Sequence, residues 1–515
     1  MISLSMFPPP VCGTTLYELN NELVAGTQSD EDAHSLHMQI LGFPPIVVNK
    51  ETLKTHGRSE PCSRAAFLTH SEPVWKRGAN AWHDSGIYGL LQEINKSADE
   101  VPKMLWRISG FALTVCHWIT SLHRSLSPQL PLNTDDLLSQ FTQVTDWKNC
   151  SLRVFSWHPH TNKCALALID DSIRVYRAGS DTVPTLRHPL QKNVAALAWK
   201  PLCASVLAAA CQSGVVGGTV DPNSLSTRPS SGCAQVLSHP GHSPVTTISW
   251  NSRGATLVSG CPTDTSMLVW DVATETAVPL QRVGGGGVSF LSWSPDSGRI
   301  LAATPSPLFR VWESHTWTCE RWPTLRDRCQ TGCWNGDGSR LLFTVLGESV
   351  IYLLTFVDPG GVLGGGGSSQ TAAICADVSQ TVFGSGDNEI RIGGEVQSMV
   401  WDPSGERLAV LLKGDPETGT RPTVAVFKTR VRPVFELLPC GFVQSGDKGS
   451  PQFISFHPRV PKGALLTVGW STGRISNIPF YFVSSQSYPP LHPPTCSPPL
   501  RICSPRSPGD LFSEL

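Results

Sequence analysis

A repeated pattern of strand-forming residues constrains the fold of this 515-residue chain more than any other feature. Each copy has an alternating apolar run that ends in an aromatic residue, then a turn with Pro, Asp or Gly, and then a second apolar run. β-Branched and aromatic residues at alternate positions are typical of half-buried strands. Seven anchor aromatics mark the copies: Trp157, Trp199, Trp250, Trp293, Trp334, Trp401 and Phe456.

The spacing of these anchors predicts a seven-bladed β-propeller. Successive anchors are separated by 42, 51, 43, 41, 67 and 55 residues, and four-stranded blades recur at about 40–45 residues. Three intervals fit directly, and three need insertions, for which Asp221–Ser238 and Pro359–Ser369 have the composition of loops. A β-sandwich would show turns at about every 8–12 residues without this longer repeat. We therefore expect an all-β fold, with the propeller over residues 148–483.

One repeat carries a polar set that is typical of WD40 blades: His242, Ser259, Asp264 and Trp270. In that motif Asp264 orients His242, which bonds to Ser259 and, through it, to the Trp270 indole, and the network stiffens the blade. A Ser–His–Asp hydrolase would instead need an exposed serine and an oxyanion hole. A second string, Gly469–Gly473, fits G-x-S-x-G but lies between two strand runs with no helix after it, which favours a hairpin turn. We predict that both sets are structural and that the chain is not an enzyme.

Two flanking regions differ from the propeller in sequence pattern and composition. Residues 1–147 predict an extension with short strands and helices, in which Thr14–Gly26 forms two strands around Asn20-Asn21 and is the best candidate to close the ring. Thr134-Asp-Asp-Leu137 is typical of a helix start. Residues 484–515 are rich in Pro and Ser and are expected to be disordered.

Two longer helices are predicted in the extension, over Glu72–Lys96 and Pro102–Leu126, from apolar residues at helical spacing. The second contains Met104–Leu122, which must be tested as a membrane span. Arg107 interrupts it and leaves only 15 uncharged residues, whereas a span needs roughly 20. We therefore expect any association with a membrane to be indirect.

Composition excludes several classes of function. Lys plus Arg total 40 and Asp plus Glu 41, a formal charge of -1, whereas a nucleic-acid binder must neutralise many phosphates with Lys and Arg. We therefore expect no direct nucleic-acid binding. The 16 cysteines include no Cys-x-x-Cys pair, so they are predicted to be reduced thiols rather than metal ligands. With no P-loop and no dinucleotide fingerprint in the sequence, we expect no cofactor and no metal.

Idiosyncratic strings resemble the aladin family of WD-repeat nucleoporins over nearly the whole chain. They include LYELNNELVAG near residue 20, LRVFSWHPHTNKCALALIDDSIRVY at 152–176, WDPSGERLAVLLKG at 401–414 and KGALLTVGWSTGRI at 462–475. The chain departs from the family in blade two, where Gly217 and Gly218 stand in place of an apolar strand with Trp. Glycine inside a strand weakens it, because it has no side chain to pack.

This resemblance implies a non-enzymatic scaffold of the nuclear pore complex at the nuclear envelope, which supports nucleocytoplasmic transport of proteins and RNA. Its implied partners are other nucleoporins, especially a transmembrane nucleoporin, and it implies a role at spindle poles and the centrosome in mitosis. The alternative is a WD40 substrate-recognition adaptor or modified-peptide reader, which would need a basic or aromatic-caged pocket on one propeller face. The sequence leaves open which face binds which partner.

Overall fold

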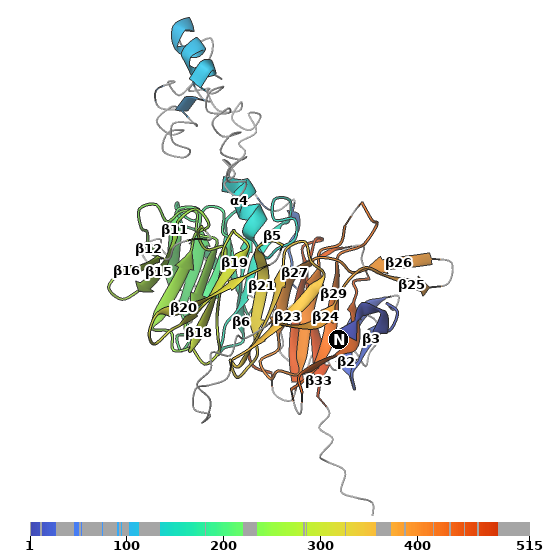
Figure 1. Ribbon diagram of the computed structural model, residues 1–515. Helices are drawn as coiled ribbons and strands as arrows, with labels where there is room; N and C mark the ends of the chain where they lie inside the picture. Colours follow the sequence, from blue (N-terminus) through green and yellow to red (C-terminus); the bar gives the residue numbers. More distant parts are fainter. Residues whose placement is uncertain are drawn as a thin grey trace, which may run out of the picture.

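The computed structural model describes most of the chain from residue 134 onward and parts of the N-terminal extension (Figure 1). The described residues are 2–10, 13–26, 46–50, 53, 75, 90, 91, 94, 102–112 and 134–482, with gaps in the last range at 181, 220–233, 282–283, 285, 325, 357–371, 386–387, 416, 432–433, 447–448 and 461–462.

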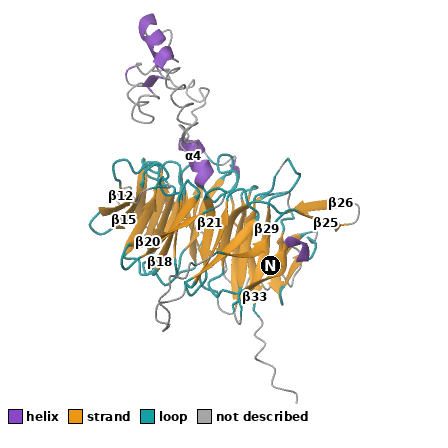
Figure 2. Cartoon of the chain, viewed as in Figure 1, coloured by secondary structure: helices purple, strands orange, loops and turns teal. Residues whose placement is uncertain are grey.

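Seven sheets form a ring, as the anchor spacing predicts. Within each blade the strands of the repeat form an antiparallel meander, and blades five and seven add strands from the N-terminal extension. The first strands of successive blades contact one another all the way round, and the first strand of blade seven contacts that of blade one. These strands are therefore innermost, and the ring is closed. Figure 2 shows the strands filling the disc and α4 lying at one of its faces.

The first four blades contain four strands each. Their bounds are β5 (Leu152–Trp157), β6 (Lys163–Leu168), β7 (Ile173–Arg177) and β8 (Thr185–Leu186) in blade one; β9 (Ala196–Trp199), β10 (Val206–Cys211), β11 (Gly214–Thr219) and β12 (Ala234–Leu237) in blade two; β13 (Thr247–Trp250), β14 (Thr256–Gly260), β15 (Ser266–Asp271) and β16 (Thr276–Gln281) in blade three; and β17 (Phe290–Trp293), β18 (Arg299–Ala303), β19 (Leu308–Glu313) and β20 (Thr318–Pro323) in blade four.

Blades five and seven incorporate strands from the N-terminal extension. Blade five has β21 (Cys329–Trp334), β22 (Arg340–Val345), β23 (Val350–Thr355) and β24 (Ala373–Asp377), and β1 (Ile2–Ser3) pairs with its outer edge. Blade six has β27 (Val396–Trp401), β28 (Arg407–Leu412), β29 (Thr423–Arg430) and β30 (Glu436–Val443). Blade seven has β31 (Pro451–Phe456), β32 (Gly463–Trp470) and β33 (Arg474–Tyr481), then β2 (Thr14–Leu19) and β3 (Glu22–Gly26), and β4 (Ile46–Val47) also pairs with β33. The other elements are η1 (Leu4–Met6), α4 (Thr134–Phe141) and the hairpin β25 (Thr381–Ser385)–β26 (Asn388–Ile392).

The candidate closing segment does supply the fourth strand of blade seven. β2 pairs with β33 in parallel, Glu18 opposite Phe480 and Leu19 opposite Tyr481. Asn20 and Asn21 have φ values of 51° and 72°, and a two-residue hairpin turn of this kind needs positive φ at both positions, which Asn tolerates. The sequence prediction of two strands around this pair is therefore confirmed.

The insertions are only partly as predicted. Asp221–Ser238 was expected to be a loop, but Ala234–Leu237 is β12, the outer strand of blade two. That prediction was wrong for its last residues because the Ser/Pro-rich composition conceals the short apolar run AQVL. The 67-residue interval before Trp401 contains the β25–β26 hairpin, which projects from the disc in Figure 1. Pro359–Ser369 lies outside the described residues.

Of the predicted helices, α4 begins at Thr134 as expected. Residues 103–112 are helical and follow the non-helical Pro102, whereas residues 113–126, nearly all of Glu72–Lys96 and the whole of 484–515 lie outside the described residues. Among the residues that the structure describes, no helix has both the length and the apolar character needed to cross a bilayer.

Candidate functional site

The anchor tryptophans form a ladder of hydrogen bonds that joins blade to blade. Each indole Nε1 donates to the carbonyl of the residue just before the anchor in the preceding blade. The bonds are Trp199 to Ser156, Trp250 to Ala198 and Trp293 to Ser249, each at 3.2 Å, and Trp334 to Ser292 at 3.1 Å. We call this series the indole ladder; it links blades one to five.

The indole ladder does not continue through blades six and seven. The buried Nε1 of Trp401 has no hydrogen-bond partner in the described part of the chain, and the seventh anchor, Phe456, has no N–H to donate. Trp157 bonds instead to the Thr467 hydroxyl of blade seven at 3.1 Å. This half of the ring must therefore be fastened differently.

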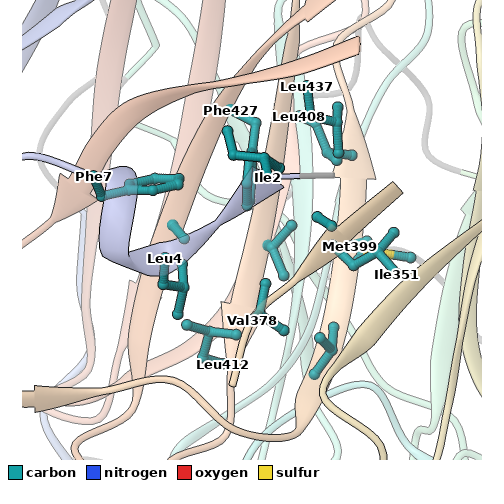
Figure 3. Close-up of a cluster of buried hydrophobic side chains, with 14 of the residues drawn as sticks. Ile2, Leu4, Phe7, Ile351, Val378, Met399, Leu408, Leu412, Phe427 and Leu437 are labelled. Atoms are coloured by element: carbon teal, nitrogen blue, oxygen red, sulfur yellow. The ribbon is translucent and has the colours of Figure 1, made fainter. Parts of the chain in front are cut away.

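The first fastening is an N-terminal strap, formed by residues 2–10 and 13–26, that crosses the rim from blade five to blade seven. Ile2 and Ser3 pair in parallel with Ala376 and Asp377 of β24. Figure 3 shows Ile2, Leu4 and Phe7 inserted among side chains of blades five and six. The Phe7 ring lies 4.9 Å from that of Phe427 and 5.0 Å from that of Phe442, centroid to centroid.

A buried ion pair then joins the strap to blade six. Arg407 Nη2 donates to Glu18 Oε1 at 2.8 Å, and their side chains are 4% and 0% exposed. Asn21 N donates to the same carboxylate oxygen at 2.6 Å. Glu18 Oε2 and Arg407 Nε have no hydrogen-bond partner among the described residues, so the Glu18 carboxylate depends on Arg407 for its charge compensation.

The second fastening is an axial cap, residues 134–150, which begins with α4. Gln143 donates to the carbonyl of Gln330 in blade five, Gln397 of blade six donates to the carbonyl of Thr142, and Thr145 N donates to the carbonyl of Gln452 in blade seven. In blade one the Arg153 guanidinium lies 3.4 Å from the centroid of the Trp147 ring, and burial lowers the pKa of Arg153 from its usual value.

The residues that receive the axial cap share a backbone feature. The innermost strands of blades one, five, six and seven each have a break in register at one residue, and β-bulges of this kind redirect a side chain. Each bulged residue stands four positions before its anchor and has a long polar side chain: Arg153, Gln330, Gln397 and Gln452. The same position in blades two, three and four holds the short side chains of Ala195, Thr246 and Ser289. This signal is visible in the sequence, although the predicted site residues did not include it.

The predicted polar network of blade three is brought together by the fold. His242 Nδ1 lies 2.8 Å from Asp264 Oδ2, His242 Nε2 lies 2.9 Å from Ser259 Oγ, and Trp270 Nε1 donates to Ser259 Oγ at 2.8 Å. Because the indole can only donate, the Ser259 hydroxyl donates to His242 Nε2, and Nδ1–H faces Asp264. Burial lowers the pKa of His242, which agrees with a neutral ring.

The same geometry prevents hydrolase chemistry at Ser259. The residue is 0% exposed, and its oxygen already accepts the Trp270 N–H, so no substrate can reach it. Ser471 of the G-x-S-x-G string lies in the turn between β32 and β33, where its Oγ accepts from Ser450 N at 3.0 Å. This is the hairpin turn that the sequence favoured.

The described cysteines and acidic residues form no visible metal centre. Within the described ranges, no group of three or more His, Cys, Asp or Glu side chains is arranged to hold a metal ion. Cys329 and Cys333, the closest pair in the sequence, are buried free thiols, and burial raises the pKa of each to about 12. A thiol of such high pKa is inert as a nucleophile.

Comparison with known proteins identifies the same seven-bladed architecture. Residues 133–481 match the family model of the Aladin seven-bladed propeller. The chain belongs to the aladin family. The protein named Aladin from Arabidopsis thaliana is 28% identical over 391 residues, which cover 70% of this chain and 83% of that relative.

Two solved structures align with about two thirds of this chain. The β-propeller domain of Cps50 (Swd1) from Myceliophteria thermophila has a TM-score of 0.48 at 14% identity, covering 64% of this chain and 96% of that one. A chain of the Mitotic Checkpoint Complex has a TM-score of 0.48 at 15% identity, covering 66% and 93%.

Blade two shows where this aladin-family chain departs from its own repeat. Leu207 pairs with Gly218, whereas in blade three the equivalent Leu257 pairs with Trp270. Blade two nevertheless has all four strands. The missing side chain at Gly217 leaves a cavity of about 210 Å³ between blades two and three, lined in part by Lys200 and Trp250.

Proposed function

We propose that this aladin-family chain is a non-enzymatic scaffold subunit of the nuclear pore complex, which supports nucleocytoplasmic transport of proteins and RNA. Family membership is the observation that carries the proposal, because the family model spans residues 133–481. A closed wheel suits a scaffold, since loops on rigid strands present binding surfaces without losing order.

The chemistry inside the propeller supports a structural use of its reactive residues. The His242–Ser259–Asp264 set has the hydrogen-bond order of a catalytic triad, yet its serine is sealed from solvent and bonded to Trp270. A buried, fully satisfied network of this kind stabilises a blade.

We infer that the partners are other nucleoporins, and that a transmembrane nucleoporin holds the chain at the nuclear envelope. The formal charge of -1 favours protein partners over nucleic acid, because phosphate neutralisation needs an excess of Lys and Arg. We further propose a mitotic role at spindle poles and the centrosome.

Fluorescent tagging of the full chain in cells tests the proposal, with the unfused fluorescent protein as control. We expect a nuclear rim in interphase, lost on depletion of the transmembrane partner, and spindle-pole signal in mitosis. Diffuse fluorescence with no rim would contradict the pore assignment. A pull-down that contains ubiquitin-ligase subunits and no nucleoporins would favour the alternative, a WD40 substrate-recognition adaptor or modified-peptide reader.

A further inference from the structure

The helix at residues 103–112 exposes its large apolar side chains and buries a small polar one. Met104 is 76% exposed, Leu105 51%, Ile108 54% and Phe111 73%, whereas Ser109 is 2% exposed. A helix of a water-soluble domain normally shows the reverse arrangement, with its apolar stripe against the core. Figure 1 shows this light-blue helix standing away from the propeller disc.

Most of the exposed apolar residues lie on one side of the helix, whereas Trp106, which is 40% exposed, lies on the opposite side. Met104, Ile108 and Phe111 are spaced i, i+4 and i+7, so they form a continuous stripe. Leu105 borders that stripe, and Ser109 lies on the far side. The outward stripe is therefore an ordered surface rather than a scatter of single exposed residues, and such surfaces mark interaction sites.

The two charged residues on this helix are both positive, although Asp99 and Glu100 come shortly before it in the sequence. Lys103 and Arg107 are exposed and lie one turn apart on the flank of the stripe. From residue 101 to residue 134 the sequence has no Asp or Glu and has Lys103, Arg107 and Arg124. Elsewhere in this nearly neutral chain, acidic and basic residues are mixed. A partner surface that is apolar and negatively charged would complement the stripe and the two cations of this helix.

We propose that this helix lies flat in the headgroup layer of an anionic lipid bilayer. Met104, Ile108 and Phe111 would enter the boundary of the acyl chains, and Lys103 and Arg107 would face the lipid phosphates. A basic helix with an apolar stripe of this kind binds at membrane surfaces. It does not cross the bilayer, because Arg107 falls within the apolar segment and the helix is too short to span.

The inference stands on the helix alone and does not depend on the pore assignment. One such helix gives weak, reversible binding, because stable anchoring needs a second signal. It would therefore add a direct lipid contact to attachment through a transmembrane protein, and the two can be measured separately.

Flotation of the purified full chain with lipid vesicles tests the proposal. Vesicles of 70% phosphatidylcholine and 30% phosphatidylserine are expected to carry the chain upward at low salt, and phosphatidylcholine vesicles to carry much less. Each basic residue near an anionic surface contributes about fivefold to partitioning, so the pair Lys103→Ala and Arg107→Ala should reduce binding about 25-fold. Ile108→Glu with Phe111→Glu should abolish it.

A matched control places the same change on the propeller. Val278 and Val382 are exposed apolar residues at 60% and 54%, so Val278→Glu with Val382→Glu adds equal charge without touching the helix and should float like the native chain. Circular dichroism melting verifies that all three double variants remain folded. If the native chain stays at the bottom with anionic vesicles, or if the helix variant floats as well as the control, the lipid proposal is wrong.

Discussion

The two halves of the ring are held together by different chemistry. Blades one to five are joined by the indole ladder, in which both partners of each bond belong to the repeated strands of neighbouring blades. Blades five, six, seven and one are joined by the N-terminal strap and the axial cap, which lie outside the repeat. The difference teaches that a repeat too irregular to close itself can be completed by segments distant in sequence, which bring their own hydrogen bonds and apolar side chains.

The ion pair of the strapped half predicts the largest loss of stability. Arg407→Ala leaves the Glu18 carboxylate buried and without its cation, and breaking such a pair typically costs about 3–5 kcal/mol. Denaturant unfolding of the full chain measures the loss. Glu18→Leu with Arg407→Met is the control, because it removes both charges and should cost less than Arg407→Ala alone. Equal losses would show that the ion pair is not what fastens the strap.

A change of similar size is expected in the ladder half from Trp270→Ala. Trp270 is 2% exposed and bonded to Ser259, and removal of a buried aromatic costs about 3–5 kcal/mol. Trp270→Phe keeps most of the packing and loses only the bond, so it should cost less. A loss below about 1 kcal/mol for Trp270→Ala, as at surface sites, would mean that the polar network does not stabilise blade three.

Acid should weaken both halves through buried histidines. Burial lowers the pKa of His242 in blade three and of His457 in blade seven. The unfolded chain then binds more protons as pH falls below the unperturbed value of about 6.5, so stability present above that pH is lost on acidification towards the lowered values. Denaturation midpoints between pH 7.5 and 5 measure this, and His242→Gln or His457→Gln should each flatten the profile. An unchanged slope in both variants would contradict the assignment.

The break in the indole ladder predicts a smaller, paired effect. Trp334→Phe loses the bond to the Ser292 carbonyl, worth about 1 kcal/mol, whereas Trp401→Phe removes an N–H that has no described partner. Both changes lose similar ring area, so the difference between them isolates the hydrogen bond. Thermal or denaturant unfolding should show Trp334→Phe to be the more costly; equal costs would remove the distinction between the two halves.

The smallest expected effect is a gain of stability in blade two. Gly217 has ordinary backbone angles, and a Cβ built there meets its nearest neighbours, the Gln235 carbonyl oxygen and Cβ, at 3.5 and 3.8 Å, which is normal contact. Gly217→Val should therefore fill part of the cavity beside Trp250 and raise stability by about 0.5–1 kcal/mol, the usual penalty of an interior glycine. A loss in unfolding free energy would show that this space is needed.

The fold could be predicted largely from the anchors, because their spacing and the turns between them are local features. The blade-three network could also be read, since His242, Ser259, Asp264 and Trp270 lie within one repeat. The Glu18–Arg407 pair could not, because its partners are 389 residues apart and no local pattern in the sequence indicates that they meet. The parallel pairing of β2 was likewise invisible, because strand pattern fixes the face of a strand and not its direction.

Hydrogen–deuterium exchange of the full chain, compared between Arg407→Ala and Trp270→Ala, tests the two-part ring most directly. Local opening reports which blades are coupled. We expect Arg407→Ala to speed exchange in the N-terminal strap and in the strands of blades five to seven, and Trp270→Ala to speed it in blade three and its neighbours. If both variants speed exchange of the same amides around the whole ring, the propeller is a single uniformly fastened unit, and its division into two differently fastened halves is wrong.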